Sequence, residues 1–178
     1  MGGPRCWPPI WAWGWPCRYI CTATSGCSAR KRKGAFVLTE YLSHSTQETE
    51  QFAREVAARL RPGDVIACRG GMGAGKTAFA RGLAAGLGLR DRVSSPTFAL
   101  VQEYTHGNIP LYHFDMYRID GFDALYSTGF FDYLEGDGVL YIEWSENIQG
   151  ALPPGAITLT IQRVDEDTRK ITIEGDRF

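Results

Sequence analysis

The alternation of apolar and polar residues from residue 36 onward predicts a series of short strands and helices. Residues 36–42 alternate well enough to predict a first strand. Ser45 or Thr46 is then expected to cap a helix, with Glu48 or Glu50 in its first turn. One face of that helix is apolar and consists of Phe52, Ala53, Val56, Ala57 and Leu60.

A strand, a glycine-rich loop and a second helix are predicted next. Residues 64–69 form a short apolar run that predicts a buried strand, and residues 70–77 are the loop. Residues 78–87 predict the helix, because apolar side chains recur there at helical spacing: Phe79, Ala80, Leu83, Ala84 and Leu87.

Two hairpins are predicted in the second half of the chain. Residues 98–104 and 111–117 read as strands on either side of a turn-forming stretch. Residues 156–164 and 169–174 flank a second, acidic turn in the same way. Between the hairpins, the pattern predicts a short helix, a further turn of structure and an apolar strand of the kind that is buried on both faces; these are residues 122–127, 130–134 and 139–144.

The loop residues Gly70 to Thr77 fit the phosphate-binding pattern G-x-x-x-x-G-K-[ST]. Glycines allow successive backbone N–H groups to face one phosphate, and the following helix directs the positive end of its dipole at the same place. Lys76 can bridge the β- and γ-phosphates, and the Thr77 hydroxyl can bind Mg²⁺. The alternative is a glycine-rich turn with a chance lysine, but the spacing and the flanking elements both match the motif. The loop therefore predicts binding of a nucleoside triphosphate with Mg²⁺.

Charge is distributed unevenly along the 178 residues, whose net charge is −1. Residues 1–35 hold six basic residues and no acid, so residues 36–178 carry 13 basic and 20 acidic residues, a net charge of −7. An acidic domain is a poor electrostatic match for nucleic acid, so any RNA is expected to be held by a partner. The length predicts one domain at residues 36–178, and no run approaches the roughly 18 apolar residues of a membrane span.

Residues 1–35 also contain four of the five cysteines and four of the five tryptophans, without a helical or strand period. One interpretation is an acid-free leader resembling an organelle transit peptide. The other, which the density of Trp and Pro favours, is an extension upstream of the natural start. We expect this segment to be disordered or poorly packed. Cys68, the one cysteine of residues 36–178, is expected to be buried mid-strand, and a domain with one cysteine suits a reducing cytosol.

Two carboxylates are candidates for the metal side of the site. Glu143 ends the most apolar strand, where side chains emerge beside the phosphate loop, although a surface acid at a strand end is the alternative. Asp115 lies in an aromatic-rich strand, and alternation places it on one face with His113 and Tyr117. It can order Mg²⁺ or the attacking water, or it can pair with Arg118 as a structural partner.

Other side chains carry weaker signals. Thr97 follows a Ser-Pro pair and can sense a γ-phosphate as switch threonines do, but the pattern alone favours a simple turn or strand-start residue. Trp144 can stack on a base or a partner, or pack in the core. His113 alone is typical of a satisfied strand histidine, and Arg169 has no functional signal of its own.

Taken together, these segments resemble the TsaE family (also called YjeE), bacterial ATPases of tRNA threonylcarbamoyladenosine biosynthesis. The resemblance covers about residues 43–174, nearly the whole domain. Its specificity lies in the order and distances of several short marks: Gly73-Ala74-Gly75-Lys76-Thr77, Arg81-Gly82, Ser95-Pro96-Thr97-Phe98, Tyr112-His113-Phe114-Asp115-Met116-Tyr117-Arg118, Gly129 with Asp132-Tyr133, and Ile142-Glu143-Trp144.

The resemblance implies an α/β fold: a small P-loop NTPase-like domain with a central, mostly parallel sheet, added antiparallel hairpins and short flanking helices. It implies slow, Mg²⁺-dependent ATP hydrolysis that supports modification of adenosine 37 in tRNAs reading ANN codons. The transfer itself would be carried out by TsaD and TsaB, to which the family docks. The tRNA would be contacted only through that complex, in the cytoplasm, with no membrane involved.

The resemblance also implies roles for individual residues. Lys76 and Thr77 would serve phosphate and Mg²⁺, with Glu143 as the second acid on the metal side. Asp115 and Thr97 would be needed for hydrolysis or coupling. The remaining residues implied to lie at the nucleotide are Thr46, Gly73, Ala74, Gly75, Ala78, Trp144 and Arg169.

Gly71-Met72 is a departure from the family, which usually has Asp-Leu at these two loop positions. The lost carboxylate bears on metal or partner contacts rather than on phosphate binding. Two rival functions remain open. One is a small-molecule P-loop kinase, although no arginine-rich lid insertion is visible. The other is a nucleotide-binding interaction module that does not hydrolyse its ligand.

Overall fold

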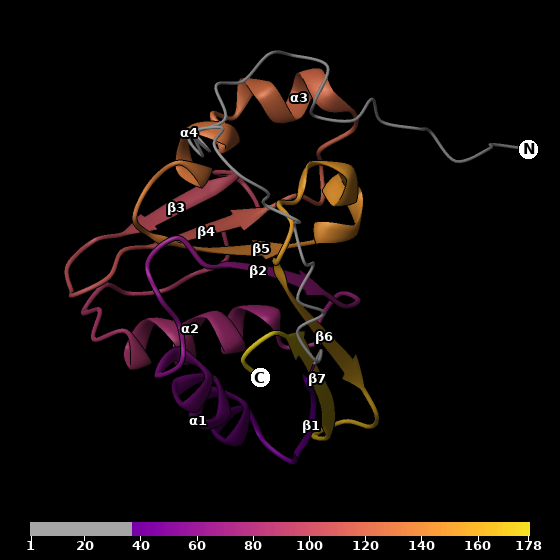
Figure 1. Ribbon diagram of the computed structural model, residues 1–178. Helices are drawn as coiled ribbons and strands as arrows, with labels where there is room; N and C mark the ends of the chain where they lie inside the picture. The colour runs from indigo at the N-terminus through magenta and orange to yellow at the C-terminus, as the bar shows by residue number, and fades with distance from the viewer. Residues whose placement is uncertain (1–36) are drawn as a thin grey trace, which may run out of the picture.

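Residues 37–178 are described by a computed structural model, which is shown in Figure 1. The expectations for residues 1–35 lie outside the described residues. The strands are β1 (Val37–Ser43), β2 (Val65–Arg69), β3 (Val101–Tyr104), β4 (Leu111–Asp115), β5 (Val139–Glu143), β6 (Ile157–Arg163) and β7 (Arg169–Gly175). The helices are α1 (Thr46–Ala57), α2 (Lys76–Gly86), α3 (Phe122–Ser127) and α4 (Phe130–Leu134), and a 3₁₀ segment, η2, spans Ser145–Ala151.

The seven strands of this region form one sheet in the order β1-β7-β6-β2-β5-β4-β3. The four central strands, β6, β2, β5 and β4, run parallel to one another. Antiparallel pairs extend both edges, with β7 and β1 on one side and β3 on the other. The predicted α/β fold, with a parallel centre and two antiparallel hairpins, is confirmed.

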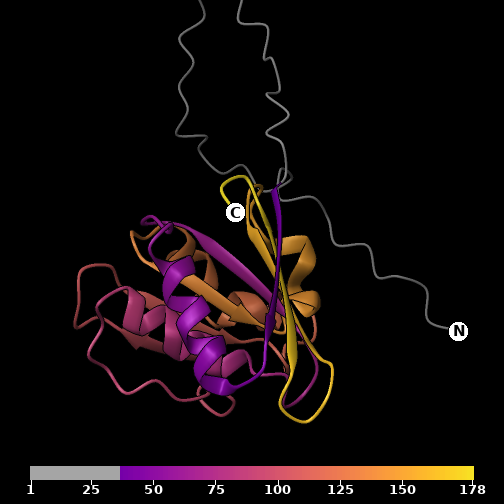
Figure 2. The ribbon, with the colours of Figure 1, turned by 90° about the horizontal axis from the view of Figure 1, so that it is seen from below.

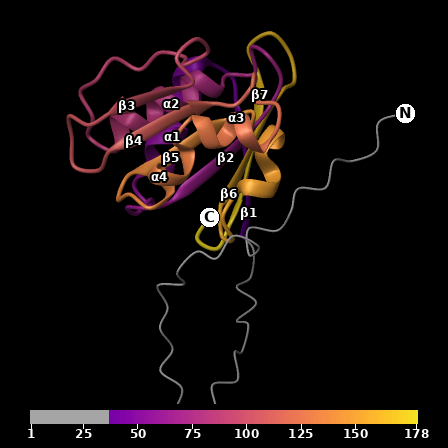
Figure 3. The same ribbon diagram turned by 90° about the horizontal axis from the view of Figure 1, so that it is seen from above.

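Helices cover both faces of the sheet, which explains why its central strand β5 is buried along its whole length (Figures 1 and 3). All five residues of β5 are buried, and the four apolar ones alternate between two hydrophobic cores. Val139 and Tyr141 join the core under α1 and α2, whereas Leu140 and Ile142 join the core under α3, α4 and η2. Strand β5 therefore has no face exposed to solvent. Its last residue, Glu143, lies at the end of the strand, between the two helical layers.

Close packing between α1 and α2 holds the second helix in place, and Figure 2 shows the pair side by side on one face of the sheet. At Gly82, an added Cβ atom would lie 2.3 Å from the Glu50 carbonyl oxygen and 2.6 Å from the Ala53 Cβ atom. Gly86 approaches Ala57 in the same way, at 2.6 Å. The glycines are thus needed because the two helix backbones touch.

The predicted strands were too long at the functional end of the sheet. Residues 98–100 form a turn instead of strand, because the N–H groups of Ala99 and Leu100 both donate to the Pro96 carbonyl at 2.9 Å. Leu100 also has a positive φ of 65°, which a strand does not allow. Strand β4 ends at Asp115, whose carboxylate accepts a hydrogen bond from the Tyr117 N–H.

One helix start and one short helical segment were also missed. The helix after the loop begins at Lys76, two residues before the prediction, because the last glycine of the loop already acts as its N-cap. The 3₁₀ segment η2 was not predicted, since residues 145–151 have no apolar period that would identify it. Among residues 37–178, no helix is both long and apolar enough to cross a membrane.

Gly82→Ala is expected to destabilise the protein, although alanine normally favours a helix by about 0.5–1 kcal/mol over glycine. The added methyl group would separate α1 from α2, and overpacking of this kind costs about 1–3 kcal/mol. The free energy of unfolding in urea measures the change. Gly136→Ala is the control, because its nearest contact would be an ordinary 3.4 Å. Equal stability of both variants would contradict the packing role.

Candidate functional site

The phosphate loop joins β2 to α2 at the carboxyl end of the parallel strands, where side chains from several strands converge. Gly73 and Gly75 have positive φ angles of 69° and 108°, a region that residues with a Cβ atom rarely adopt. Gly70 has no room for a side chain, because a Cβ atom would lie 2.5 Å from the Ile161 carbonyl oxygen. The backbone thus needs these glycines to turn directly into the helix.

Lys76 is buried against the loop that precedes it and is 5% exposed. Its Nζ atom donates to the carbonyl oxygens of Gly70 and Gly71, both at 2.9 Å. The same ammonium group lies 4.1 Å from the centre of the Trp144 ring, a cation–π distance. The ammonium group of Lys76 is therefore held by the loop backbone and by the Trp144 ring.

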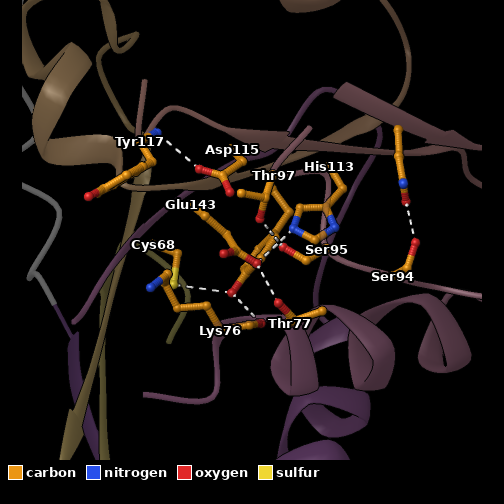
Figure 4. Close-up of polar contacts among 12 residues, drawn as sticks. Cys68, Lys76, Thr77, Ser94, Ser95, Thr97, His113, Asp115, Tyr117 and Glu143 are labelled. Carbon is orange, nitrogen blue, oxygen red and sulfur yellow. Dashed lines mark hydrogen bonds and ion pairs between the residues drawn. The ribbon is translucent and has the colours of Figure 1, made fainter. Parts of the chain in front are cut away.

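Thr77 and Glu143 contact each other across the loop, as Figure 4 shows. The Thr77 hydroxyl donates to Oε1 of Glu143 at 3.1 Å. Glu143 is 3% exposed, so its carboxylate belongs to the site and not to the surface. His113 lies on the other side of the same oxygen, with Nε2 at 2.9 Å.

Asp115 lies directly beside Glu143, because these two residues face each other in the parallel pairing of β4 and β5. It is 4% exposed and accepts a hydrogen bond from the Tyr117 N–H at 2.9 Å. The alternative role as a partner of Arg118 has no contact to support it in residues 37–178. The Arg118 guanidinium group lies instead over the Phe98 ring, at 5.2 Å.

Thr97 lies in the turn before β3, and it lines the same cavity as the phosphate loop. Its hydroxyl is 2.7 Å from the Ser95 hydroxyl, and both residues line the same cavity. The segment is anchored by Tyr104, whose hydroxyl donates to the Ser94 carbonyl at 3.1 Å and accepts from the Ser94 N–H at 3.3 Å. Burial raises the pKa of this Tyr104 phenol.

A cavity of about 440 Å³ brings the candidate residues together, a size typical of small-molecule sites. Arg169 enters it from the β6–β7 hairpin and donates from Nε to the Ala74 carbonyl at 3.1 Å. The cavity is lined by all twelve residues predicted for the site: Thr46, Gly73, Ala74, Gly75, Lys76, Thr77, Ala78, Thr97, Asp115, Glu143, Trp144 and Arg169.

Four further cavity residues were not predicted as site residues from the sequence, namely Met72, Arg81, Ser95 and Tyr117. Arg81 is held by Glu50 of α1, with Nε 2.8 Å from Oε1. His113 was interpreted as a satisfied strand histidine, but this holds for one ring nitrogen alone: within residues 37–178, Nε2 pairs with Glu143 and the buried Nδ1 has no hydrogen-bond partner. The strand alternation that groups His113 with Asp115 was the one signal that pointed there.

Tyr141, on β5, holds the start of α2 from inside the core. Its hydroxyl donates to the Lys76 carbonyl oxygen at 2.8 Å and lies 3.1 Å from the Cys68 sulfur. Burial raises the pKa of Tyr141 well above its ordinary value, so the phenol stays neutral and able to donate. A buried tyrosine of this kind normally has a partner for its hydroxyl, and here that partner is a helix end.

The donor set suits Mg²⁺ bound together with phosphate. Among residues 37–178, no group of three or more His, Cys, Asp or Glu side chains is arranged to hold a metal ion. Mg²⁺ usually takes only one or two protein ligands and completes its shell with phosphate oxygens and water. Because the Thr77 hydroxyl donates its hydrogen to Glu143, its lone pairs remain free to bind a cation.

The comparisons with known proteins agree on one family. Residues 43–171, which include every cavity residue, match the family model for "Threonylcarbamoyl adenosine biosynthesis protein TsaE". The chain is similar to proteins named tRNA threonylcarbamoyladenosine biosynthesis protein TsaE. The one from Bacillus subtilis is 41% identical over 134 residues, 74% of this chain and 84% of the relative. The one from Treponema pallidum is 36% identical over 132 residues, 74% of this chain and 97% of the relative.

A solved structure shows the same fold. The crystal structure of Bacillus subtilis YdiB superimposes with a TM-score of 0.67 and 36% sequence identity. The match covers 79% of this chain and 86% of that chain. At this identity and TM-score, the solved structure supports the fold described above.

Cys68 is expected to resist alkylation in the native protein. Its side chain is fully buried, and burial raises the pKa of the thiol, so little thiolate forms. Iodoacetamide at mildly alkaline pH should leave the peptide containing Cys68 unmodified, whereas the same treatment in urea should modify it. Mass spectrometry of that peptide is the measurement. Equal modification with and without urea would contradict the burial of this residue.

Proposed function

The chain belongs to the TsaE family, and we propose that it is a Mg²⁺-dependent ATPase acting in tRNA N6-threonylcarbamoyladenosine biosynthesis. The modified base is adenosine 37 of tRNAs that read ANN codons. The main support for the ATPase proposal is the hydrogen bond between Glu143 and Thr77, the last residue of the phosphate loop. A hydroxyl and a carboxylate in contact at this position are what a P-loop enzyme needs on the metal side of its phosphates.

Each residue of the site has a role in this proposal. The backbone N–H groups of residues 73–78 and the N-terminal end of α2 bind the phosphates. Lys76 leaves the carbonyl groups of Gly70 and Gly71 and moves to the β- and γ-phosphates. Thr77 and Glu143 would hold Mg²⁺, which would supply positive charge beside the phosphate oxygens.

Two further residues act on the triphosphate end of the ligand. Asp115, next to Glu143 on the adjacent strand, orients the attacking water. Thr97 contacts the γ-phosphate through its hydroxyl and couples hydrolysis to the turn that carries it. Trp144, Arg169 and Thr46, the first residue of α1, also line the cavity.

We further propose that the chain acts with TsaD and TsaB in the cytoplasm and reaches tRNA only through that complex. The net charge of −7 over residues 36–178 supports this, because an acidic protein is repelled by a phosphate backbone. ATP binding and hydrolysis would then control an interaction between proteins. The threonylcarbamoyl group would be transferred by the partners.

Lys76→Ala and Glu143→Gln test the site. Lys76→Ala is expected to weaken nucleotide binding by about 10- to 100-fold, because a charged hydrogen bond to phosphate is lost. Glu143→Gln is expected to retain binding without metal and to lose about 10- to 100-fold in Mg²⁺-dependent hydrolysis. Binding of a fluorescent nucleotide and phosphate release measure the two effects.

Matched controls are available on the surface, where Lys170→Ala and Glu135→Gln change the same charges away from the cavity. Both controls should behave like the unmodified protein. If Lys76→Ala and Glu143→Gln also do so, the assignment of the site is wrong. Fast turnover that requires one small acceptor molecule would instead favour the kinase alternative.

Association with purified TsaD and TsaB is expected to depend on nucleotide. A pull-down with ATP should recover the complex, and formation of the modified adenosine by the reconstituted proteins should require this chain. Lys76→Ala should fail in both measurements, while Lys170→Ala should succeed. Modification at the full rate without this chain would contradict the proposal.

A further inference from the structure

His113 is buried at the centre of the site without lining the cavity. Its side chain is 0% exposed, and it lies on β4, two residues before Asp115. The edge of its ring meets Tyr141, with ring centres 5.2 Å apart, and Tyr104 packs nearby at 6.4 Å. The histidine therefore has no direct route to a ligand and can act only through a neighbour.

The hydrogen bond to Glu143 determines the tautomer of His113. A carboxylate oxygen accepts and does not donate, so Nε2 must carry the hydrogen that bridges the 2.9 Å to Oε1. The other ring nitrogen, Nδ1, is buried with no hydrogen-bond partner in the described structure. An apolar side chain would fill this place without leaving a polar atom unpaired, so the bond to Glu143 is the distinctive contribution of the histidine.

Both hydrogen bonds to Glu143 converge on the same oxygen. Oε1 accepts from His113 on one side and from Thr77 on the other, and the hydrogen bonds found in residues 37–178 do not use Oε2. Two donors on one oxygen fix the rotation of the carboxylate. Oε2 is not among the buried atoms without a partner, and Glu143 lines the cavity, so this second oxygen is the one available for the metal-side chemistry of the proposed function.

We propose that His113 is a positioning residue that orients the Glu143 carboxylate for Mg²⁺. The inference rests on the proposed Mg²⁺-dependent ATPase function. It assigns His113 no contact with nucleotide, metal or water. Partners of this kind, which hydrogen-bond a metal-side ligand from behind, affect metal affinity by about 10- to 100-fold when they are removed.

Three substitutions separate positioning from simple packing. His113→Phe keeps the ring volume and removes the donor, while His113→Gln keeps an N–H group at about the distance of Nε2. His113→Leu removes the donor in a second way, in case the larger ring of phenylalanine disturbs folding. His106→Phe is the matched control, since this exposed histidine lies in the β3–β4 turn at the opposite end of the parallel strands.

The measurement is binding of a fluorescent ADP analogue, with EDTA and across a Mg²⁺ titration, alongside thermal unfolding of each protein. His113→Phe and His113→Leu are expected to need about tenfold more Mg²⁺ for half of the metal-dependent increase in affinity. Their affinity in EDTA should be unchanged. His113→Gln should bind within about twofold of the unmodified protein, as should His106→Phe.

The outcomes distinguish this inference from the proposed function itself. If the unmodified protein shows no Mg²⁺-dependent binding, the proposed function fails. If it does, and His113→Phe and His113→Leu have the same Mg²⁺ requirement as His106→Phe, the positioning role is overturned. Equal losses with EDTA and with Mg²⁺, without recovery in His113→Gln, would overturn it too, since they indicate a packing role alone.

Discussion

Two hydrogen bonds tie the first turn of α2 to the end of β5, and the geometry of the site depends on them. Tyr141 donates to the Lys76 carbonyl oxygen from inside the core, and Thr77 donates to Glu143 at its edge. One bond fixes the backbone of the helix start, and the other fixes its side chains against the neighbouring strand. Because α2 is also held against α1 through Gly82, the helix cannot slide along the sheet. The phosphate loop, which precedes α2, therefore ends at a helix start that is fixed in position.

The sequence predicted those parts of the fold that are local in the chain. The loop, the two hairpins and the position of Glu143 all followed from short patterns with a physical reason. The edge pairing of β1 with β7 did not, because it joins opposite ends of the described chain and leaves no mark in either segment. The link between His113 and Glu143 was hidden for the same reason, since it depends on two strands lying side by side.

Strand ends were harder to predict than strands. Asp115 is the last residue of β4, and its carboxylate accepts the hydrogen bond from the Tyr117 N–H that turns the chain there. The same carboxylate is a candidate residue of the phosphate site. Trp144 follows β5 with a positive φ of 57°, a conformation that is unfavourable for a residue with a Cβ atom. The turn directs its ring over Lys76.

Gly71, in the phosphate loop, departs from the family pattern for a reason other than crowding. There is open space where a Cβ atom would lie at this position.

The contacts of Lys76 have a consequence for any measured affinity. Its ammonium group already has two carbonyl oxygens and an aromatic ring as partners. A phosphate must exchange with these groups, so the observed binding free energy is a difference between two occupied states of the same lysine. The loop backbone thus acts as an internal competitor, whose effective concentration is fixed by the fold. A change that tightens the loop around Lys76 would weaken nucleotide binding without touching the nucleotide.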